Sequence, residues 1–546
     1  MLKNIFLALC SLWLTIFSFS QSQHKGGIAR PKLVIGLVVD QMRWDYLYRY
    51  YDLYSANGFK RLLNEGFSCE NTLIPYLPTY TAPGHACIYT GSVPAIHGIV
   101  GNNWFERSIN KTIYCTDDSA ASTIGSNSTA GKMSPANLWT TTITDELRLS
   151  NNFKSKVIGI ALKDRAAILP AGHNANAAYW FDIKEGKWIS SSYYMAQLPD
   201  WLNKFNEKHL PDIYMSKDWN TLLPLSKYDL STADNKEYEH SITGETSVTF
   251  PHKLSQISKQ KYLAFEYTPF GNTYTFDLAK SAIENEKLGN NTVTDFLTIS
   301  LSSTDYIGHS FGPNSIEVED TYLRLDNDIT EFLQFLDAKL GNGNYLLFLS
   351  ADHGVAHIPG FLQEHNIPAG LFNQSTLTKE INQLLEKKFS FKNGVLNIQN
   401  YQVYLNTDEI EKRGKILPEI KQAVIDYLQQ QSFIINAFET EKISVASIPE
   451  PIKKMLINGY NPKRSGDIHF ILKAGYFDGT ITGTTHGSWN PYDAHIPLVW
   501  FGWNIKHGTT NRETYMTDIA PTIAAMLKIQ MPSGSVGKVI EEVTGF

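Results

Sequence analysis

Short apolar runs recur along the chain, and most of them end at polar side chains. Each run has the length of a single strand. A nearly uninterrupted apolar strand is buried on both faces, which is typical of a parallel sheet. The five runs occupy residues 33–39, 157–162, 296–301, 345–349 and 496–501.

Helical spacing of apolar residues appears between these runs, for example over residues 318–340 and 519–527. Strands that alternate with helices predict an α/β fold, here a three-layer α/β/α sandwich with a mostly parallel central sheet. In open sheets of this kind, ligands bind beyond the carboxyl ends of the strands. Polar residues at those ends are therefore the first candidates for chemistry.

Two stretches break the alternation, at about residues 185–256 and 374–477. We interpret both as insertions that cap the core of one catalytic domain spanning residues 21–546, rather than as independent domains. The second stretch has elements of its own. Its predicted strands and helices lie at residues 401–405, 468–472, 409–412 and 418–430.

The first 20 residues have the pattern of a secretory signal peptide. Lys3 gives a positive start, residues 5–19 are apolar, and Ser18 and Ser20 precede an expected cleavage before Gln21. The alternative is a membrane anchor, but this run is short for a span of about 20 residues. No later stretch is apolar enough to span, so we expect an exported chain without a membrane anchor once mature.

The composition excludes two classes of protein. The chain has 546 residues, of which 42% are hydrophobic and 19% charged, so it is not intrinsically disordered. Its 48 Lys+Arg and 54 Asp+Glu residues give a net charge of −6. Without a basic excess, no nucleic-acid partner is expected.

Three cysteines remain in the mature chain, namely Cys69, Cys87 and Cys115. An oxidising compartment permits one disulfide bond with one cysteine left over. Cys87 lies in a predicted helix, where we expect a small buried apolar residue. That leaves Cys69 with Cys115 as the expected pair.

Carboxylates and imidazoles follow several of the predicted strands. Catalytic zinc takes three protein ligands of these types and keeps one position open, so two zinc ions need six ligands. Asp305 and His309 are four residues apart and would share one face of a helical turn. The six candidates are Asp40, Asp305, His309, Asp352, His353 and His486.

A threonine is the candidate nucleophile. Thr81 would be the N-cap of a helix with Pro83 in its first turn, where free N–H groups and the positive end of the dipole favour an alkoxide and bind phosphate. On this segment alone, an ordinary helix cap is the simpler interpretation. Thr79 is the competing hydroxyl.

Basic residues follow the second apolar run. On an extended strand end, Lys163 and Arg165 would point the same way and converge on one anion, with Arg165 as a bidentate fork to phosphate oxygens. The alternative is a solvated charge cluster. Asn102 follows a glycine-rich turn and adds an uncharged amide donor.

Together these residues resemble a known family. The segments at Asp40, Thr81, Asp305 (D-x-x-G-H), Asp352 (ADHG) and His486 (THG) are similar to the alkaline phosphatase superfamily, over nearly the whole mature chain. Thr81 followed by Asn102 resembles its nucleotide pyrophosphatase/phosphodiesterase branch. The added Lys163 and Arg165 resemble the PafA-type periplasmic alkaline phosphatases, which hydrolyse phosphate monoesters. A sulfatase is not expected, because no Cys/Ser-x-Pro-x-Arg segment lies near Thr81.

The resemblance implies a mechanism and a ligand set. One zinc ion would bind Asp305, His309 and His486, and the other would bind Asp40, Asp352 and His353 with Thr81 as an exchangeable ligand. Thr81 would form a phosphothreonine intermediate. Asn102, Lys163 and Arg165 would bind the phosphate oxygens, and Lys163 would stand where other phosphatases hold magnesium. A broad range of small phosphate monoesters, a periplasmic location and a monomer are expected.

Two alternatives stay open. A two-zinc phosphodiesterase or nucleotide pyrophosphatase of the same superfamily would share the metals and the threonine but would have no use for Lys163 and Arg165. A secreted metal-binding or glycan-binding protein without turnover would fit the aromatic content of 12%.

Overall fold

A computed structural model describes residues 29–545 of the chain. The expected signal peptide, residues 1–20, lies outside the described residues. Residues 31–546 form one compact unit. Across the described part of the chain, no helix combines the length and the apolar character that a bilayer crossing requires.

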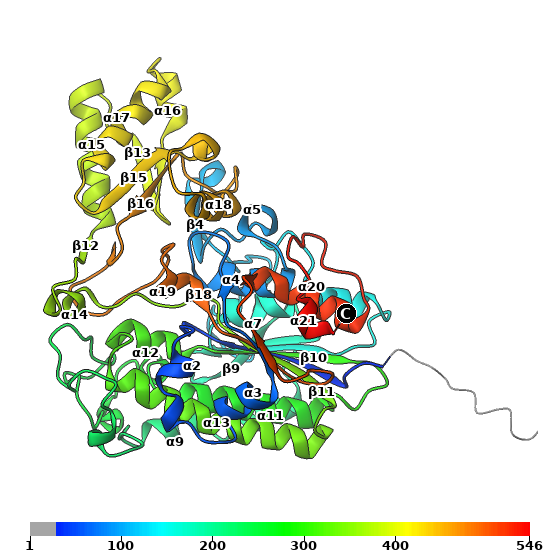
Figure 1. The fold of residues 1–546 in the computed structure, drawn as a ribbon. Helices are drawn as coiled ribbons and strands as arrows, with labels where there is room; N and C mark the ends of the chain where they lie inside the picture. The colour runs from blue at the N-terminus through cyan, green and yellow to red at the C-terminus, as the bar shows by residue number, and fades with distance from the viewer. Residues whose placement is uncertain (1–28, 546) are drawn as a thin grey trace, which may run out of the picture. The chain divides into compact units, whose positions relative to one another are not determined.

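A sheet of ten strands runs through the described part of this unit (Figure 1). Its middle strands β11, β1, β10, β7 and β8 are all parallel to their neighbours in this group. Antiparallel pairs extend it, as β19 joins β11 and β9 joins β8. Across the sheet the order is β20 (Gly508–Thr510), β2 (Phe67–Cys69), β19 (Leu498–Gly502), β11 (Tyr345–Ser350), β1 (Leu33–Val39), β10 (Asp295–Leu301), β7 (Val157–Ala161), β8 (Ala177–Asp182), β9 (Lys187–Ser191) and β6 (Thr123–Ile124).

Helices cover both faces of this sheet (Figure 1). Long helices α11 (Phe270–Glu286) and α13 (Ile316–Leu340) lie on one face. Helices α4 (Thr81–Thr90), α7 (Asp164–Ala171) and α20 (Ile519–Leu527) lie on the other. Every residue of β1 and β10 is buried as a result. The expected three-layer α/β/α sandwich with a mostly parallel sheet is confirmed.

The last apolar run differs from its expected form. It is divided into β18 (His495–Ile496) and β19 (Leu498–Gly502), and β19 runs antiparallel to β11. Pro497 stands at the break, because proline has no N–H to donate to a strand ladder. Its carbonyl oxygen instead accepts from Ser350 Oγ at 2.8 Å.

Smaller sheets accompany the main one. A hairpin joins β4 to β5, a parallel pair joins β12 to β17, and β3 lies between β18 and β21. Their bounds are β4 (Asn103–Glu106), β5 (Lys111–Tyr114), β12 (Gly370–Phe372), β17 (Tyr476–Asp478), β3 (Thr72–Leu73) and β21 (Thr514–Tyr515).

Residues 374–477 contain their own sheet and their own hydrophobic core. The strands expected at 401–405 and 468–472 and the helices expected at 409–412 and 418–430 are present within one or two residues. The elements are α15 (Gln374–Phe389), β13 (Val395–Gln399), β14 (Gln402–Leu405), α16 (Thr407–Lys412), α17 (Leu417–Gln429), β15 (Ile434–Glu439), α18 (Glu450–Gly459) and β16 (Ile468–Leu472).

Residues 185–256 are mostly loop with short helices α8 (Asp200–Asn206) and α9 (Leu210–Met215). Strand β9 lies inside this stretch but belongs to the central sheet. Ion pairs attach the rest of the stretch to α13, since His252 lies between Glu245 and Glu317. That both insertions cap the catalytic core stays a prediction.

The expected disulfide bond is wrong. Cys69, Cys87 and Cys115 are all buried free thiols. Cys69 belongs to the main hydrophobic core, whereas Cys115 packs in a separate cluster with Trp104. The number of cysteines in a sequence carries no information on the distances between them. Cys69 and Cys115 are held apart because they pack in different cores. Cys87 is the small buried apolar residue that the sequence predicts.

Candidate active site and metal centre

Polar residues from four neighbouring parallel strands meet at one edge of the sheet. Asp40 follows β1, Lys163 follows β7 and Asp352 follows β11. Asp305 lies in the first turn of α12 (Ser303–Phe311), which follows β10. Because parallel strands end at the same edge, residues far apart in sequence become neighbours there.

Lys163 lies between two of these carboxylates. Its Nζ is 2.7 Å from Asp40 Oδ2 and 2.5 Å from Asp305 Oδ2, and its side chain is 1% exposed. Burial lowers the pKa of Lys163, but the two carboxylates outweigh burial and the net pKa is raised. The amine is therefore a fixed positive charge in the site.

Three histidines turn the same ring nitrogen towards the backbone. Nδ1 of His309 lies 2.7 Å from the carbonyl oxygen of Thr484, and Nδ1 of His486 lies 2.7 Å from that of Thr79. Nδ1 of His353 lies 3.0 Å from the carbonyl oxygen of Gly354. A carbonyl oxygen only accepts, so each Nδ1 carries the proton and each Nε2 keeps its lone pair free for a ligand.

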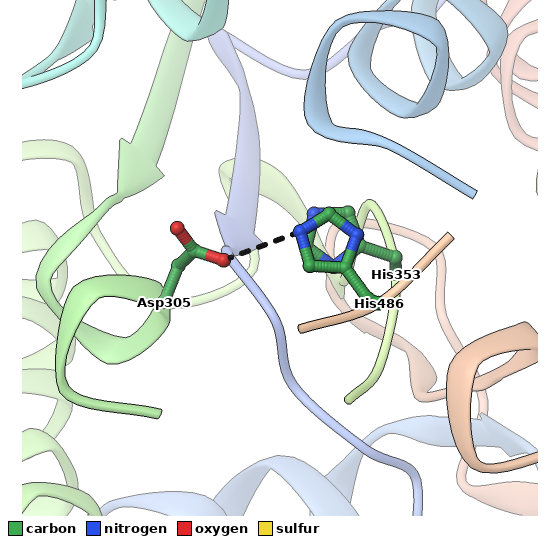
Figure 2. A group of neighbouring side chains, drawn as sticks. All are labelled: Asp305, His353 and His486. Carbon is green, nitrogen blue, oxygen red and sulfur yellow. Dashed lines mark ion pairs between the residues drawn. The ribbon is translucent and has the colours of Figure 1, made fainter. Parts of the chain in front are cut away.

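The three Nε2 atoms face the carboxylates. His309 Nε2 is 3.2 Å and His486 Nε2 is 3.7 Å from Asp305 Oδ1. His353 Nε2 is 3.3 Å from Asp352 Oδ2 and 3.6 Å from Asp40 Oδ1. Figure 2 shows Asp305 pointing towards the rings of His353 and His486, which are stacked with centroids 3.5 Å apart.

Two groups of these side chains have the spacing to hold a metal ion. Asp40, Asp352 and His353 form one group, the same three residues that the family resemblance assigns to one ion. The other group is Asp305, His353 and His486, with His353 in place of His309. His309 lies beside Asp305, and its ring centroid is 5.1 Å from that of His486. The assignment of His309 to the second ion stays a prediction.

The donor set fits cations. Asp40 Oδ1 and Asp352 Oδ2 are buried and have no hydrogen-bond partner, which is costly unless a cation satisfies them. Burial lowers the pKa of His353 to about 3. Burial also lowers the pKa of His486 well below its ordinary value. Both rings are therefore neutral, as a metal ligand requires.

Thr81 does not cap the helix that begins there. The N-cap of α4 is Tyr80, so Thr81 is the first helical residue and the expected N-cap position is wrong by one. No side-chain cap bond forms there. Thr81 Oγ1 instead lies 3.3 Å from His353 Nε2, while the Thr79 hydroxyl donates to the carbonyl oxygen of Ser488 at 3.0 Å.

Asn102 is tied to the start of the same helix. Its Oδ1 accepts from the N–H of Ala82 at 2.9 Å, which satisfies one of the free donors of the first turn. The carboxamide NH2 group is the end left to reach a ligand. Directly after Asn102, strand β4 begins and pairs with β5 as a hairpin.

Arg165 differs from its expected setting. Lys163 is the N-cap of α7, and Arg165 lies in the first turn of that helix, not on an extended strand end. The spacing argument for convergence on one anion therefore does not hold. Arg165 Nη1 donates instead to the Tyr114 hydroxyl at 3.0 Å, and Tyr114 is the last residue of β5.

Three further residues of the site carry no sequence signal strong enough to find them. Tyr114 holds Arg165 as described. Gln41 has a left-handed φ of 66°, and it donates from its N–H to Asp352 and from Nε2 to Asp305 at 3.1 and 2.7 Å. His85 Nδ1 lies 2.9 Å from the carbonyl oxygen of Thr81. Only the position of Gln41 directly after a strand-end aspartate hints at its role.

Comparison with known proteins identifies the family. Residues 34–493 match the family described as type I phosphodiesterase / nucleotide pyrophosphatase. The alkaline phosphatase PhoV of Synechococcus elongatus is 53% identical over 94% of this chain and 93% of its own length. The alkaline phosphatase PafA of Elizabethkingia meningoseptica is 51% identical over 96% of both chains. The chain belongs to this family, within the alkaline phosphatase superfamily.

The similarity of this phosphatase to PafA extends to its structure. A crystal structure of PafA matches with a TM-score of 0.93 and covers 95% of this chain and 100% of its own. A crystal structure of a PafA variant, with one threonine, one asparagine, one lysine and one arginine substituted, matches with the same TM-score. A Myroides odoratus protein named calcium-transporting ATPase is 54% identical over 94% of this chain and 95% of its own length.

Proposed function

We propose that this alkaline phosphatase hydrolyses a broad range of small phosphate monoesters with two zinc ions and a phosphothreonine intermediate at Thr81. One observation carries the proposal. The Thr81 hydroxyl lies at a helix N-terminus, 3.3 Å from His353 and free of any capping bond, whereas the Thr79 hydroxyl is engaged with Ser488. A hydroxyl in this position can attack phosphorus.

The candidate ligands support the metal part of the proposal. Asp40, Asp352 and His353 would hold one zinc ion, with Thr81 beside it, and Asp305, His309 and His486 would hold the other. When bound, the ions would favour the ionised hydroxyl and neutralise charge on the attacking and leaving oxygens. The protein's own part is to keep the imidazoles of His353 and His486 neutral and to aim each Nε2 at the carboxylates.

Asn102, Lys163 and Arg165 would bind the phosphate group of the substrate. A monoester dianion carries one more charged oxygen than a diester, and fixed cations at that oxygen favour the monoester. A buried charge-assisted contact contributes on the order of 2–4 kcal/mol. The PafA variant with a substituted threonine, asparagine, lysine and arginine supports the choice, because these are the residue types proposed here.

The proposed enzyme is exported, has one catalytic domain and is a monomer. The pattern of residues 1–20 supports export, which gives a periplasmic location in a Gram-negative source. The two insertions would cap one catalytic domain, and the enzyme would act as a monomer.

The decisive experiment pairs metal content with substrate preference. Purified enzyme should contain two zinc ions per chain, lose activity with a chelator and regain it with zinc. An aryl phosphate should be hydrolysed far faster than a diaryl phosphate, and ATP is a further substrate to compare because one relative is named an ATPase. Preference for the diester would favour the phosphodiesterase alternative. Full activity without metal would overturn the proposal, and absence of turnover with zinc bound would favour a binding protein.

A further inference from the structure

A cavity of about 400 Å³ opens onto His309. Of the three site histidines, His309 has a side chain that is 31% exposed, whereas those of His353 and His486 are 0% and 5% exposed. This cavity is therefore the side from which the imidazoles of the site can be reached. Its volume lies in the range that holds small organic ligands.

Three separate segments form the walls of this cavity, which we call the leaving-group cavity. His240 and Thr243 come from the first insertion, and Tyr267 follows helix α10 (Lys261–Glu266). The third wall comes from residues 477–480 and 482–485, which begin at the last residue of the second insertion and include Asp478.

The walls are joined to one another and to His309. His240 Nδ1 lies 3.2 Å from Thr482 Oγ1, which connects the first wall to the third. Thr484 donates its N–H to the carbonyl oxygen of His309 at 2.8 Å. Gly483 has a φ of 77°, and a Cβ there would lie 2.6 Å from that same oxygen, so only glycine lets the segment pass this closely over His309.

One wall also reaches the phosphate-binding residues. The ring of Tyr267 lies 5.0 Å from that of Tyr306, and Lys163 Nζ lies 4.9 Å from the Tyr306 ring centroid. The cavity thus begins where the candidate phosphate site ends, on the Asp305 and His309 side. Thr81 Oγ1 lies 3.3 Å from His353, and neither of these two residues lines the cavity. In-line displacement sends the leaving oxygen away from the nucleophile.

The charge of the lining is one-sided. Among the described residues that line the cavity, none is a lysine or an arginine, and the carboxylate is that of Asp478. The Asp478 side chain is fixed, because its Oδ1 accepts from the N–H of Gln374 at 3.1 Å. The other polar residues that line it include five threonines and one serine.

We propose that the leaving-group cavity receives the alcohol of the monoester and that Asp478 makes it favour neutral and cationic alcohols over anionic ones. The inference rests on the proposed phosphatase mechanism. It gives the first insertion a role in substrate choice through His240 and Thr243, and it gives a role to Asp478, directly after the second insertion. The phosphate end of the substrate is untouched by these residues.

The test uses three monoesters of similar size whose released alcohols differ in charge. Glycerol phosphate releases a neutral alcohol, phosphoethanolamine a cationic one and phosphoglycerate an anionic one. For each substrate, the kcat/KM of a variant is divided by that of the wild type at the same alkaline pH, so that the intrinsic reactivity of the substrate cancels. Asp478→Asn keeps the acceptor for Gln374 and removes only the charge.

We expect Asp478→Asn to raise kcat/KM for phosphoglycerate about fivefold, to lower it for phosphoethanolamine about fivefold and to leave glycerol phosphate within about twofold, as expected for one charge a few ångströms away in a partly solvated site. Thr243→Lys should act in the same direction from the first insertion. Asp426→Asn, which removes an exposed charge from α17, is the matched control and should change none of the ratios.

Equal ratios for all three substrates in both variants would overturn the inference. That outcome is distinct from failure of the proposed function. If the wild type hydrolyses none of the three monoesters, the phosphatase mechanism fails. If it hydrolyses all three but the variants do not separate them, only the leaving-group cavity fails.

Discussion

Arg165 donates from Nη1 to the Tyr114 hydroxyl at 3.0 Å, and that hydroxyl in turn donates to Asp164 at 2.5 Å. Asp164 also accepts from the backbone N–H of Arg165 at 2.6 Å. Arg165 Nε is buried without a hydrogen-bond partner. The guanidinium group is therefore oriented by a phenol and not by a carboxylate, which leaves its charge available to a substrate.

Tyr114→Phe should reduce monoester hydrolysis through Arg165. Loss of a hydrogen bond to a charged group costs about 1.5 kcal/mol, which is roughly a tenfold fall in kcat/KM. Diester hydrolysis should change little, since Arg165 is proposed to act on the extra charged oxygen. In an Arg165→Ala background, Tyr114→Phe should have no further effect. Tyr50→Phe, which removes a buried hydroxyl without a partner, is the control.

Lys163→Ala combined with Arg165→Ala should lower monoester kcat/KM by at least about a hundredfold, because two charge-assisted contacts to the dianion are lost. Diester kcat/KM should stay within a few-fold of the wild type. Lys163 also contacts Asp40 and Asp305, so zinc content of the variant is measured alongside. An equal loss on both substrates, at unchanged zinc content, would contradict the assigned role.

Thr81→Ala should abolish the trapped phosphoenzyme and lower kcat by at least about a thousandfold. Thr79→Ala should leave the phosphoenzyme in place, because the Thr79 hydroxyl is engaged with Ser488. Acid quenching with labelled phosphate, followed by peptide mapping, locates the label. Label retained at this segment in Thr81→Ala would identify Thr79 as the nucleophile.

His252 should make stability depend on pH. Burial lowers its pKa, but hydrogen bonds to Glu245 and Glu317 outweigh burial and raise the pKa from 6.5 to about 9. When the folded pKa of a histidine is raised, its stabilisation of the fold is fully present at a pH below its pKa in the unfolded chain. This contribution is lost as pH rises from about 6.5 to about 9. It amounts to at most about 3 kcal/mol.

The measurement is the free energy of unfolding in urea across this pH window, for zinc-loaded enzyme. His252→Gln should be less stable than the wild type at low pH and should approach it as pH rises. His507→Gln, at an exposed histidine, should follow the wild type throughout. Parallel curves for the wild type and His252→Gln would show that His252 does not titrate as described.

The strands were predictable because burial on both faces demands continuous apolar runs. Residues 33–39 are β1 without any change. The meeting of Asp40, Asp305 and Asp352 at one edge follows from the rule that parallel strands end together. Pro497 divides the last run into two strands, as a residue without an N–H does in a strand ladder. The antiparallel direction of β19 is set by tertiary pairing, which a run of apolar residues does not encode.

The errors in the site have one physical origin. The start of α7 turns Arg165 out of the extended geometry assumed for it, and the start of α4 moves Thr81 from cap to first helical residue. Helix boundaries depend on contacts that arrive from elsewhere, such as the hairpin carrying Tyr114. The prediction of a Cys69–Cys115 disulfide bond was wrong for a related reason, since the distance between two thiols is set by the fold and not by their positions in the sequence.

The candidate ligands begin at Asp40 and end at His486, and the chain has 546 residues. A growing polypeptide therefore lacks the complete set until nearly nine-tenths of it has been made. If two ions bind as proposed, no early fragment can hold both, and complete loading follows the synthesis of His486 and the assembly of the strands. A truncation that removes His486 should in consequence lack one of the two proposed ligand sets, and its metal content should fall.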